Sequence, residues 1–142
     1  MSNIDELTIS WTRDRADQLR MSFRRMFGFV LLAETILAVA LIIWPATFAG
    51  LTAWPAPNAT LWIRAAGVMW LVIGLFQVPG WFDPIYQRWS NIVGLPWRFL
   101  LAVLCACLGG FAWVLAVAEF AAAVGLLLLY WRALSAELLC RP

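Results

Sequence analysis

Residues 99–131 read FLLAVLCACLGGFAWVLAVAEFAAAVGLLLLYW, and Glu119 is the only charged residue in this stretch. A single helix of these 33 residues would be ~50 Å long, whereas the hydrocarbon core of a bilayer is ~30 Å thick. The stretch must therefore turn once, and Gly109-Gly110 is the best position for the turn because glycine interrupts helices. The pattern predicts two membrane-spanning helices, at about 96–110 and 113–133.

Two further apolar runs precede this stretch, each close to the roughly 20 residues that a membrane-spanning helix needs. The first covers about 26–48, with Pro45 marking its end, and the second covers about 62–78 and stops at Pro79-Gly80. Together with the later pair they predict four spans. The expected fold is therefore an all-α, integral membrane four-helix bundle.

The segments outside these spans predict surface elements. Residues 49–61 carry no charge and indicate a loop or a shallow interfacial segment. Asp83-Pro84 resembles the start of a helix, which predicts a short surface helix over about 81–95. Residues 1–25 hold nine of the eighteen charges and predict an amphipathic cytoplasmic helix lying on the membrane surface, and residues 134–142 are expected to form a cytoplasmic tail.

The composition fits a membrane protein and argues against several kinds of chemistry. The chain is 64% hydrophobic and 13% charged, with a mean hydropathy of +0.84. Histidine is absent, which removes the usual axial ligand of haem and the commonest ligand of transition metals. A net charge of +2 without a basic stripe does not suggest nucleic-acid binding. We expect no metal, no cofactor and no nucleic-acid partner, and no catalytic residue stands out.

Tryptophan and arginine indicate how the chain lies in the membrane. Indole rings favour the boundary between hydrocarbon and headgroups, and eight of the ten tryptophans lie at the edges of apolar runs. Trp70 is instead in the middle of a run, where packing against lipid or within the core is expected. Nine of the ten arginines lie on the side of the termini, so we expect both termini in the cytoplasm. The predicted interfacial anchors are Trp44, Trp62, Trp81, Trp97, Trp113 and Trp131, accompanied by Trp54 and Trp89.

A candidate intramembrane polar network comprises Glu34, Arg64, Gln77, Arg98 and Glu119. Acidic residues within spans are commonly functional, so the two glutamates could carry a proton or bind a cation. The alternative is structural: Arg64 would pair with Glu119, Arg98 with Glu34, and Gln77 would hydrogen-bond between helices. We favour the structural hypothesis because an arginine is available on the side of each acid, and losing one partner of such a pair is strongly destabilising.

The arrangement of these features resembles the DoxX-like group of small four-helix bacterial membrane proteins. The resemblance covers about residues 26–133 and is architectural. It implies a four-helix fold in the bacterial inner membrane. Some DoxX-like proteins are associated with quinone-linked sulfur oxidation, for which this chain offers no matching residues. The features that carry it are Pro45, Arg64-Ala-Ala-Gly67, Asp83-Pro84, Arg98 and Glu119.

Three classes of function remain open. The leading hypothesis is a non-catalytic accessory or scaffold subunit of a larger membrane complex, because aromatic rims and small-residue helix faces need no substrate. The second is a small transporter or binder of a hydrophobic or protonatable molecule that uses Glu34 and Glu119. A quinone-linked enzyme subunit comes third, because an acid and an arginine make a thin catalytic set. The expected partners are membrane lipid and either other membrane subunits or further copies of this chain.

Overall fold

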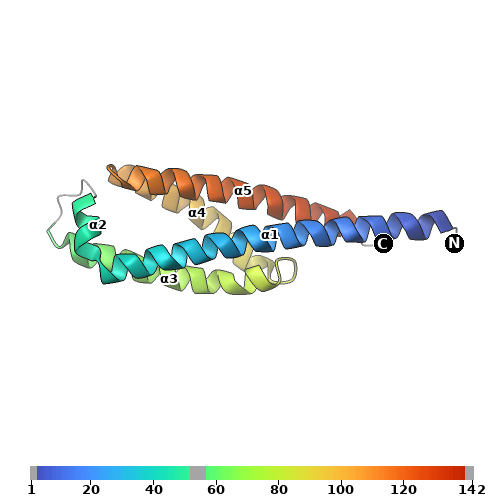
Figure 1. Ribbon diagram of the computed structural model, residues 1–142, viewed down its shortest axis with the longest axis horizontal. Helices are drawn as coiled ribbons and strands as arrows, with labels where there is room; N and C mark the ends of the chain where they lie inside the picture. The colour runs from blue at the N-terminus through green and yellow to red at the C-terminus, as the bar shows by residue number, and fades with distance from the viewer. Residues whose placement is uncertain (1–2, 52–56, 140–142) are drawn as a thin grey trace.

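The computed structural model describes residues 3–51 and 57–139, with side chains placed for 13–51 and 57–138. It contains four long helices and one short helix that follows the first of them. The long helices alternate in direction, so α1 begins and α5 ends at one end of the molecule, the termini end, and α2 lies at the other, the α2 end (Figure 1). The helices are α1 (Asn3–Ile43), α2 (Pro45–Leu51), α3 (Ala59–Phe82), α4 (Arg88–Leu108) and α5 (Ala112–Leu139).

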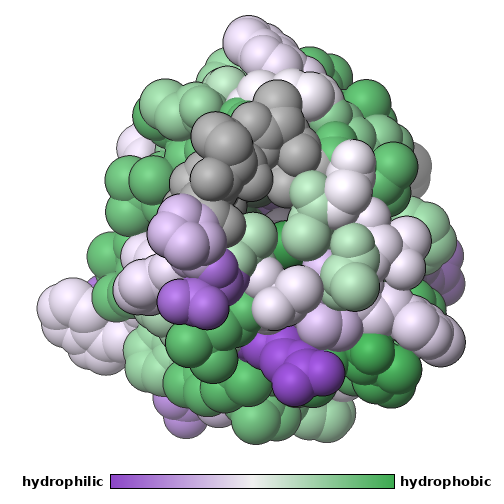
Figure 2. Space-filling model, turned by 90° about the vertical axis from the view of Figure 1, so that its left-hand side faces the viewer, coloured by the Kyte–Doolittle hydropathy of each residue, from purple (hydrophilic) through white to green (hydrophobic). Residues whose placement is uncertain are grey.

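The four long helices form a bundle in which α1 and α4 are diagonal to each other. α1 packs against α3 and α5, and α4 packs against the same two helices from the opposite corner. All four contain a segment long and apolar enough to cross a membrane, and large hydrophobic side chains are exposed along each. Seen from the α2 end, hydrophobic residues cover much of the periphery and strongly hydrophilic ones form small patches (Figure 2). The expected all-α four-helix membrane fold is confirmed.

The core follows buried positions that are three or four residues apart along each helix. This spacing places one face of each helix toward the bundle axis, as in coiled-coil packing. Close approach is possible where the core residue is small: a Cβ added to Gly67 on α3 would lie 2.8 Å from the backbone oxygen of Ala38 on α1. On α5 the buried positions are Ala112, Ala116, Glu119, Ala123, Leu126, Tyr130 and Ala133.

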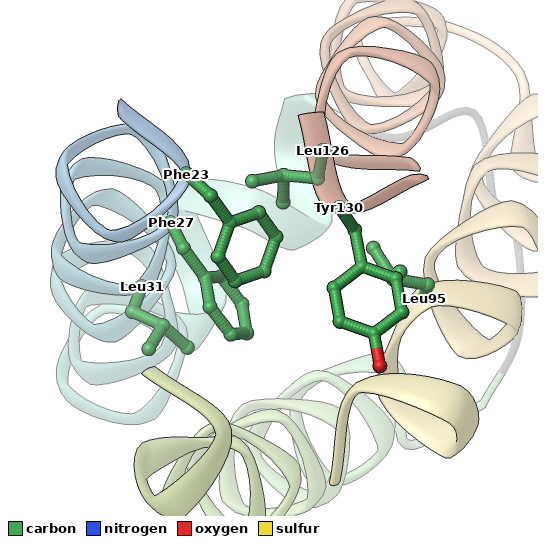
Figure 3. Packing of buried hydrophobic residues seen from close by; sticks show 6 residues of the cluster. All are labelled: Phe23, Phe27, Leu31, Leu95, Leu126 and Tyr130. Atoms are coloured by element: carbon green, nitrogen blue, oxygen red, sulfur yellow. The ribbon is translucent and has the colours of Figure 1, made fainter. Parts of the chain in front are cut away.

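The amino-terminal segment is part of α1 and does not form the separate surface helix expected for residues 1–25. From residue 3 to residue 43 the sequence contains no proline and one glycine, so nothing interrupts a helix ~61 Å long. Phe23 and Phe27 of α1 are buried against Leu126 and Tyr130 of α5 (Figure 3). The ring centroids of Phe23 and Tyr130 are 5.5 Å apart. The carboxyl-terminal residues expected to form a tail likewise continue α5 as far as residue 139.

The connection between α3 and α4 also differs from the expected surface helix over 81–95. α3 continues through Pro79 to Phe82, residues 83–87 form a turn, and α4 begins at Arg88. Side chains of α4 supply hydrogen bonds near the end of α3, where Pro79 has no N–H to donate. Ser90 Oγ donates to the backbone oxygen of Phe76 (2.7 Å), and Asn91 Nδ2 donates to the oxygens of Gly80 and Pro84 (both 3.3 Å).

This early start changes the position of the third span. Pro96, expected to open the helix, lies inside α4. Asp83, expected to begin a helix, ends α3, and its carboxylate accepts a hydrogen bond from the backbone N–H of Tyr86 in the turn. The turn expected at Gly109-Gly110 is present and separates α4 from α5. Gly109 and Gly110 have φ values of 69° and 57°, which glycine adopts readily.

Candidate functional site

Arg98 is the central residue of the candidate site. It lies at the midpoint of α4, ten residues from each end, and only 1% of its surface is exposed. The side chain contacts residues from each of the other three long helices. A fully charged guanidinium buried in this way needs partners that offset the loss of hydration.

Glu34 of α1 is the closest partner of Arg98. Nη1 donates to Glu34 Oε1, and Nη2 donates to Oε2 at 3.1 Å, so both carboxylate oxygens face the guanidinium. This two-point geometry is the strongest form of an arginine–carboxylate pair. Because α1 and α4 are diagonal, the pair links two helices whose backbones do not pack against each other.

Gln77 of α3 provides the second contact. Its Oε1 accepts a hydrogen bond of 2.7 Å from Arg98 Nη2, and its side chain is fully buried. Gly94, one turn before Arg98 on α4, gives the amide its room, because an added Cβ would lie 2.9 Å from Gln77 Cγ and Cδ. α4, which carries Arg98, therefore also holds the Gln77 amide oxygen toward the guanidinium.

Glu119 of α5 completes the group, which we call the Arg98 cluster: Glu34, Gln77, Arg98 and Glu119. Glu119 Oε2 lies 3.6 Å from Arg98 Nη1, an ionic contact that is too long for a hydrogen bond. Among the described residues, no group hydrogen-bonds this buried oxygen, and none accepts a hydrogen bond from Arg98 Nε. Glu119 is thus the loosely held member, although only 7% of its surface is exposed.

Apolar side chains lie on both sides of the Arg98 cluster along the bundle. Leu31, Leu95 and Ala123 are buried one turn toward the termini end, and the ring of Phe27 lies 5.6 Å from the Arg98 guanidinium carbon. A cation over an aromatic face gains a further attraction. The buried positions one turn toward the α2 end are small or apolar: Ala38, Ala102 and Ala116. The cluster is therefore one polar layer within an apolar core.

Arg64 does not belong to the cluster, and its expected pairing with Glu119 is wrong. Arg64 lies near the start of α3, is exposed, and forms no ion pair within the described part of the chain. Glu119 contacts Arg98 instead, because the early start of α4 moves Arg98 from the end of a span to its middle. The expected contact between Arg98 and Glu34 is present.

The predicted tryptophan anchors occupy different environments. Trp44, Trp62 and Trp113 are exposed near the α2 end, and Trp131 is exposed on the last part of α5. Trp81 is partly buried, and its Nε1 donates to the backbone oxygen of Arg24 at 2.8 Å, which joins α3 to α1. Trp97 lies well inside α4, next to Arg98, so its expected position at the edge of a span is wrong. Trp70 packs in the core with Ala38, Leu41 and Ile63, and Trp54 lies outside the described residues.

Four buried residues of α4 near the cluster or its supporting turn were not among the predicted site residues. They are Ser90, Asn91, Gly94 and Cys105. The signal was the spacing along α4. Asn91, Leu95, Arg98, Ala102 and Cys105 are separated by four, three, four and three residues, which is the spacing of a core-facing stripe.

Comparison with protein-family models, curated proteins and solved structures finds no match to this chain. The fold defines it as an all-α protein with four candidate membrane spans.

Proposed function

We propose that this chain is a non-catalytic integral membrane protein that serves as an accessory or scaffold subunit of a larger membrane complex. One observation carries the proposal: the Arg98 guanidinium contacts polar side chains of all three other long helices. Polar groups that meet inside a bundle stabilise helix association in lipid. The intramembrane charges thus have an evident structural role that requires no substrate.

The shape of the termini end supports an assembly role. α1 extends past the end of α5 (Figure 1), and Arg13, Asp14 and Arg15 of α1 are exposed. Such a helix offers a polar surface next to the membrane, on the side where the arginines concentrate. Under the positive-inside rule this side is cytoplasmic, and the architectural likeness to DoxX-like proteins is consistent with a bacterial inner membrane.

Site-specific photo-crosslinking in native membranes tests the assembly role. A photoreactive amino acid at exposed Gln18, on α1, should give one discrete adduct heavier than the monomer, because a stable partner occupies a fixed position. The matched control is the exposed mid-span residue Leu75 of α3, where lipid contact predicts no discrete protein adduct. Native mass spectrometry after mild extraction then identifies the adduct. Absence of any protein adduct from several exposed positions on α1, together with a purely monomeric mass, would contradict the proposal.

A second candidate function is a transporter or binder of a protonatable molecule, favoured by the buried Glu119 Oε2 that lacks a hydrogen bond within the described structure. Proton flux into liposomes containing the purified protein distinguishes the two. The accessory role predicts flux equal to that of empty liposomes. A higher flux that both Glu34→Gln and Glu119→Gln abolish, with helical content retained, would favour transport.

A further inference from the structure

The Arg98 cluster contains an imbalance of charge. Within residues 13–51 and 57–138, the only side chains that are both charged and buried are Glu34, Arg98 and Glu119. Gln77, the contribution of α3, is neutral, and α4 adds only the thiol of Cys105, which is close enough to Glu119 to interact with its charge. Two ionised carboxylates against one guanidinium would leave a net negative charge in an apolar core. Such a charge is normally neutralised rather than left unpaired.

The geometry distinguishes the two carboxyl groups. Both oxygens of Glu34 face N–H groups of Arg98, which is the arrangement of an ionised carboxylate. Glu119 Oε2 has only the 3.6 Å contact, and no hydrogen bond to it exists in the described part of the chain. We infer that the Arg98 cluster is a proton-binding site that holds one proton on Glu119 while Glu34 and Arg98 form an ion pair.

A metal ion is a poorer way to balance the charge. Divalent cations such as Ca²⁺ and Mg²⁺ take six or more oxygen ligands. Both Glu34 oxygens and the Gln77 oxygen already accept hydrogen bonds from Arg98. The Glu119 carboxylate is therefore the main group in the cluster that is free to bind a metal ion. No group of three metal-binding side chains occurs among the described residues. A proton needs only one oxygen, so it fits the site.

This inference goes beyond the accessory role and is independent of it. When Glu119 is neutral, α5 packs against α4 without a second full charge next to Arg98. When the proton leaves, the cluster carries one net negative charge, and Glu119 must compete with Glu34 for the same Nη1 atom. Proton release is thus coupled to the contact between α4 and α5.

Infrared spectroscopy of the purified protein at neutral pH tests the inference. The carbonyl stretch of a protonated carboxyl group is distinct from that of a carboxylate and shifts in D₂O, and a detergent without ester groups leaves that region clear. We expect one such band per chain in the wild type. Glu119→Gln should remove it, and so should Glu34→Gln, because a single carboxyl group opposite Arg98 would then be ionised. Glu137→Gln, near the end of α5 and outside the cluster, is the matched control and should retain the band.

Thermal stability locates the proton. An amide resembles a neutral carboxyl group, so Glu119→Gln should melt within a few degrees of the wild type. Glu34→Gln removes the ionised partner and should melt at a clearly lower temperature. Equal losses for the two variants would overturn the assignment to Glu119. A folded wild type without the band would overturn the proposal, as would a band that appears only when Na⁺ is removed, since a sodium ion would then balance the charge.

Discussion

Arg98 and Glu34 lie on diagonally opposite helices, and their paired hydrogen bonds cross the centre of the bundle. Neighbouring helices can associate through small residues and shape alone, but the backbones of α1 and α4 do not pack against each other. The pair, together with the contact between Arg98 and the Phe27 ring, therefore fixes the rotation of two helices whose backbones are related through α3 and α5.

Breaking this pair should be costly. Replacing Arg98 or Glu34 by alanine leaves one buried charge without its main partner, for which a loss of about 3–5 kcal/mol is typical. The double variant should lose less than the sum, with a coupling of about 0.5–3 kcal/mol. Reversible unfolding in mixed micelles, followed by circular dichroism, measures the unfolding free energies of the wild type, the two single variants and the double variant. Additive effects would mean that the two side chains do not interact in the folded protein.

Two glycines on α3 provide a matched test of helix packing. An added Cβ at Gly67 would lie 2.8 Å from the backbone oxygen of Ala38, whereas at Gly74 nothing lies within 4 Å. Gly67→Ala should destabilise the bundle by about 1–3 kcal/mol, because backbone atoms must move apart. Gly74→Ala should cause no loss, since alanine is preferred to glycine in a helix by about 1 kcal/mol. Unfolding in mixed micelles compares the two, and equal effects would contradict the observed approach of α1 and α3.

Gly94 and Gln77 should behave as a coupled pair. Gly94→Ala places a methyl group 2.9 Å from Gln77 Cγ and Cδ, so the amide must leave Arg98, and we expect a loss of about 1–3 kcal/mol. In a Gln77→Ala background the methyl group finds space, and the same substitution should cost much less. The comparison of unfolding free energies in the two backgrounds is the measurement. An unchanged cost would show that the methyl group collides with something else.

Hydrophobic pattern was sufficient to predict the four spans, since apolar runs of membrane-spanning length need no tertiary information. The Gly109-Gly110 turn followed for the same reason, because a single 33-residue span would be too long and paired glycines are a strong local signal. Local signals failed at prolines. Pro96 indicated a helix start, yet it lies inside α4, where contacts of Ser90 and Asn91 with the end of α3 hold the preceding turn helical.

The start of α4 is the boundary that explains most of the errors in the predicted site. With the third span starting at 96, Arg98 is a residue near the membrane surface, and Arg64 is the natural partner for Glu119. With α4 starting at 88, Arg98 is at mid-helix and reaches both acids. The amphipathic pattern of α1 was similarly ambiguous, because the same stripe of phenylalanines can face headgroups or the Tyr130 ring of α5.

Arg64 should contribute little to the fold. Its side chain is exposed and has no ion-pair partner in the described structure, so Arg64→Ala should change stability by no more than about 0.5 kcal/mol. Combining it with Glu119→Gln should give additive effects, because the two residues do not meet. The same unfolding assay applies. A coupling energy comparable to that expected between Arg98 and Glu34 would restore the pairing of Arg64 with Glu119.

The orientation of the bundle is open to direct labelling. The start of α1 and the end of α5 lie at the same end of the molecule, and the arginines concentrated there predict a cytoplasmic location. In a background with Cys105, Cys107 and Cys140 replaced by serine, cysteines at Arg13 and Glu137 should react with a membrane-impermeant maleimide only after cells are opened. A cysteine at exposed Trp62, near the α2 end, should react in intact cells and serves as the opposite control. Reaction of both terminal cysteines in intact cells would reverse the orientation. Reaction of only one of them in intact cells would contradict an even number of spans.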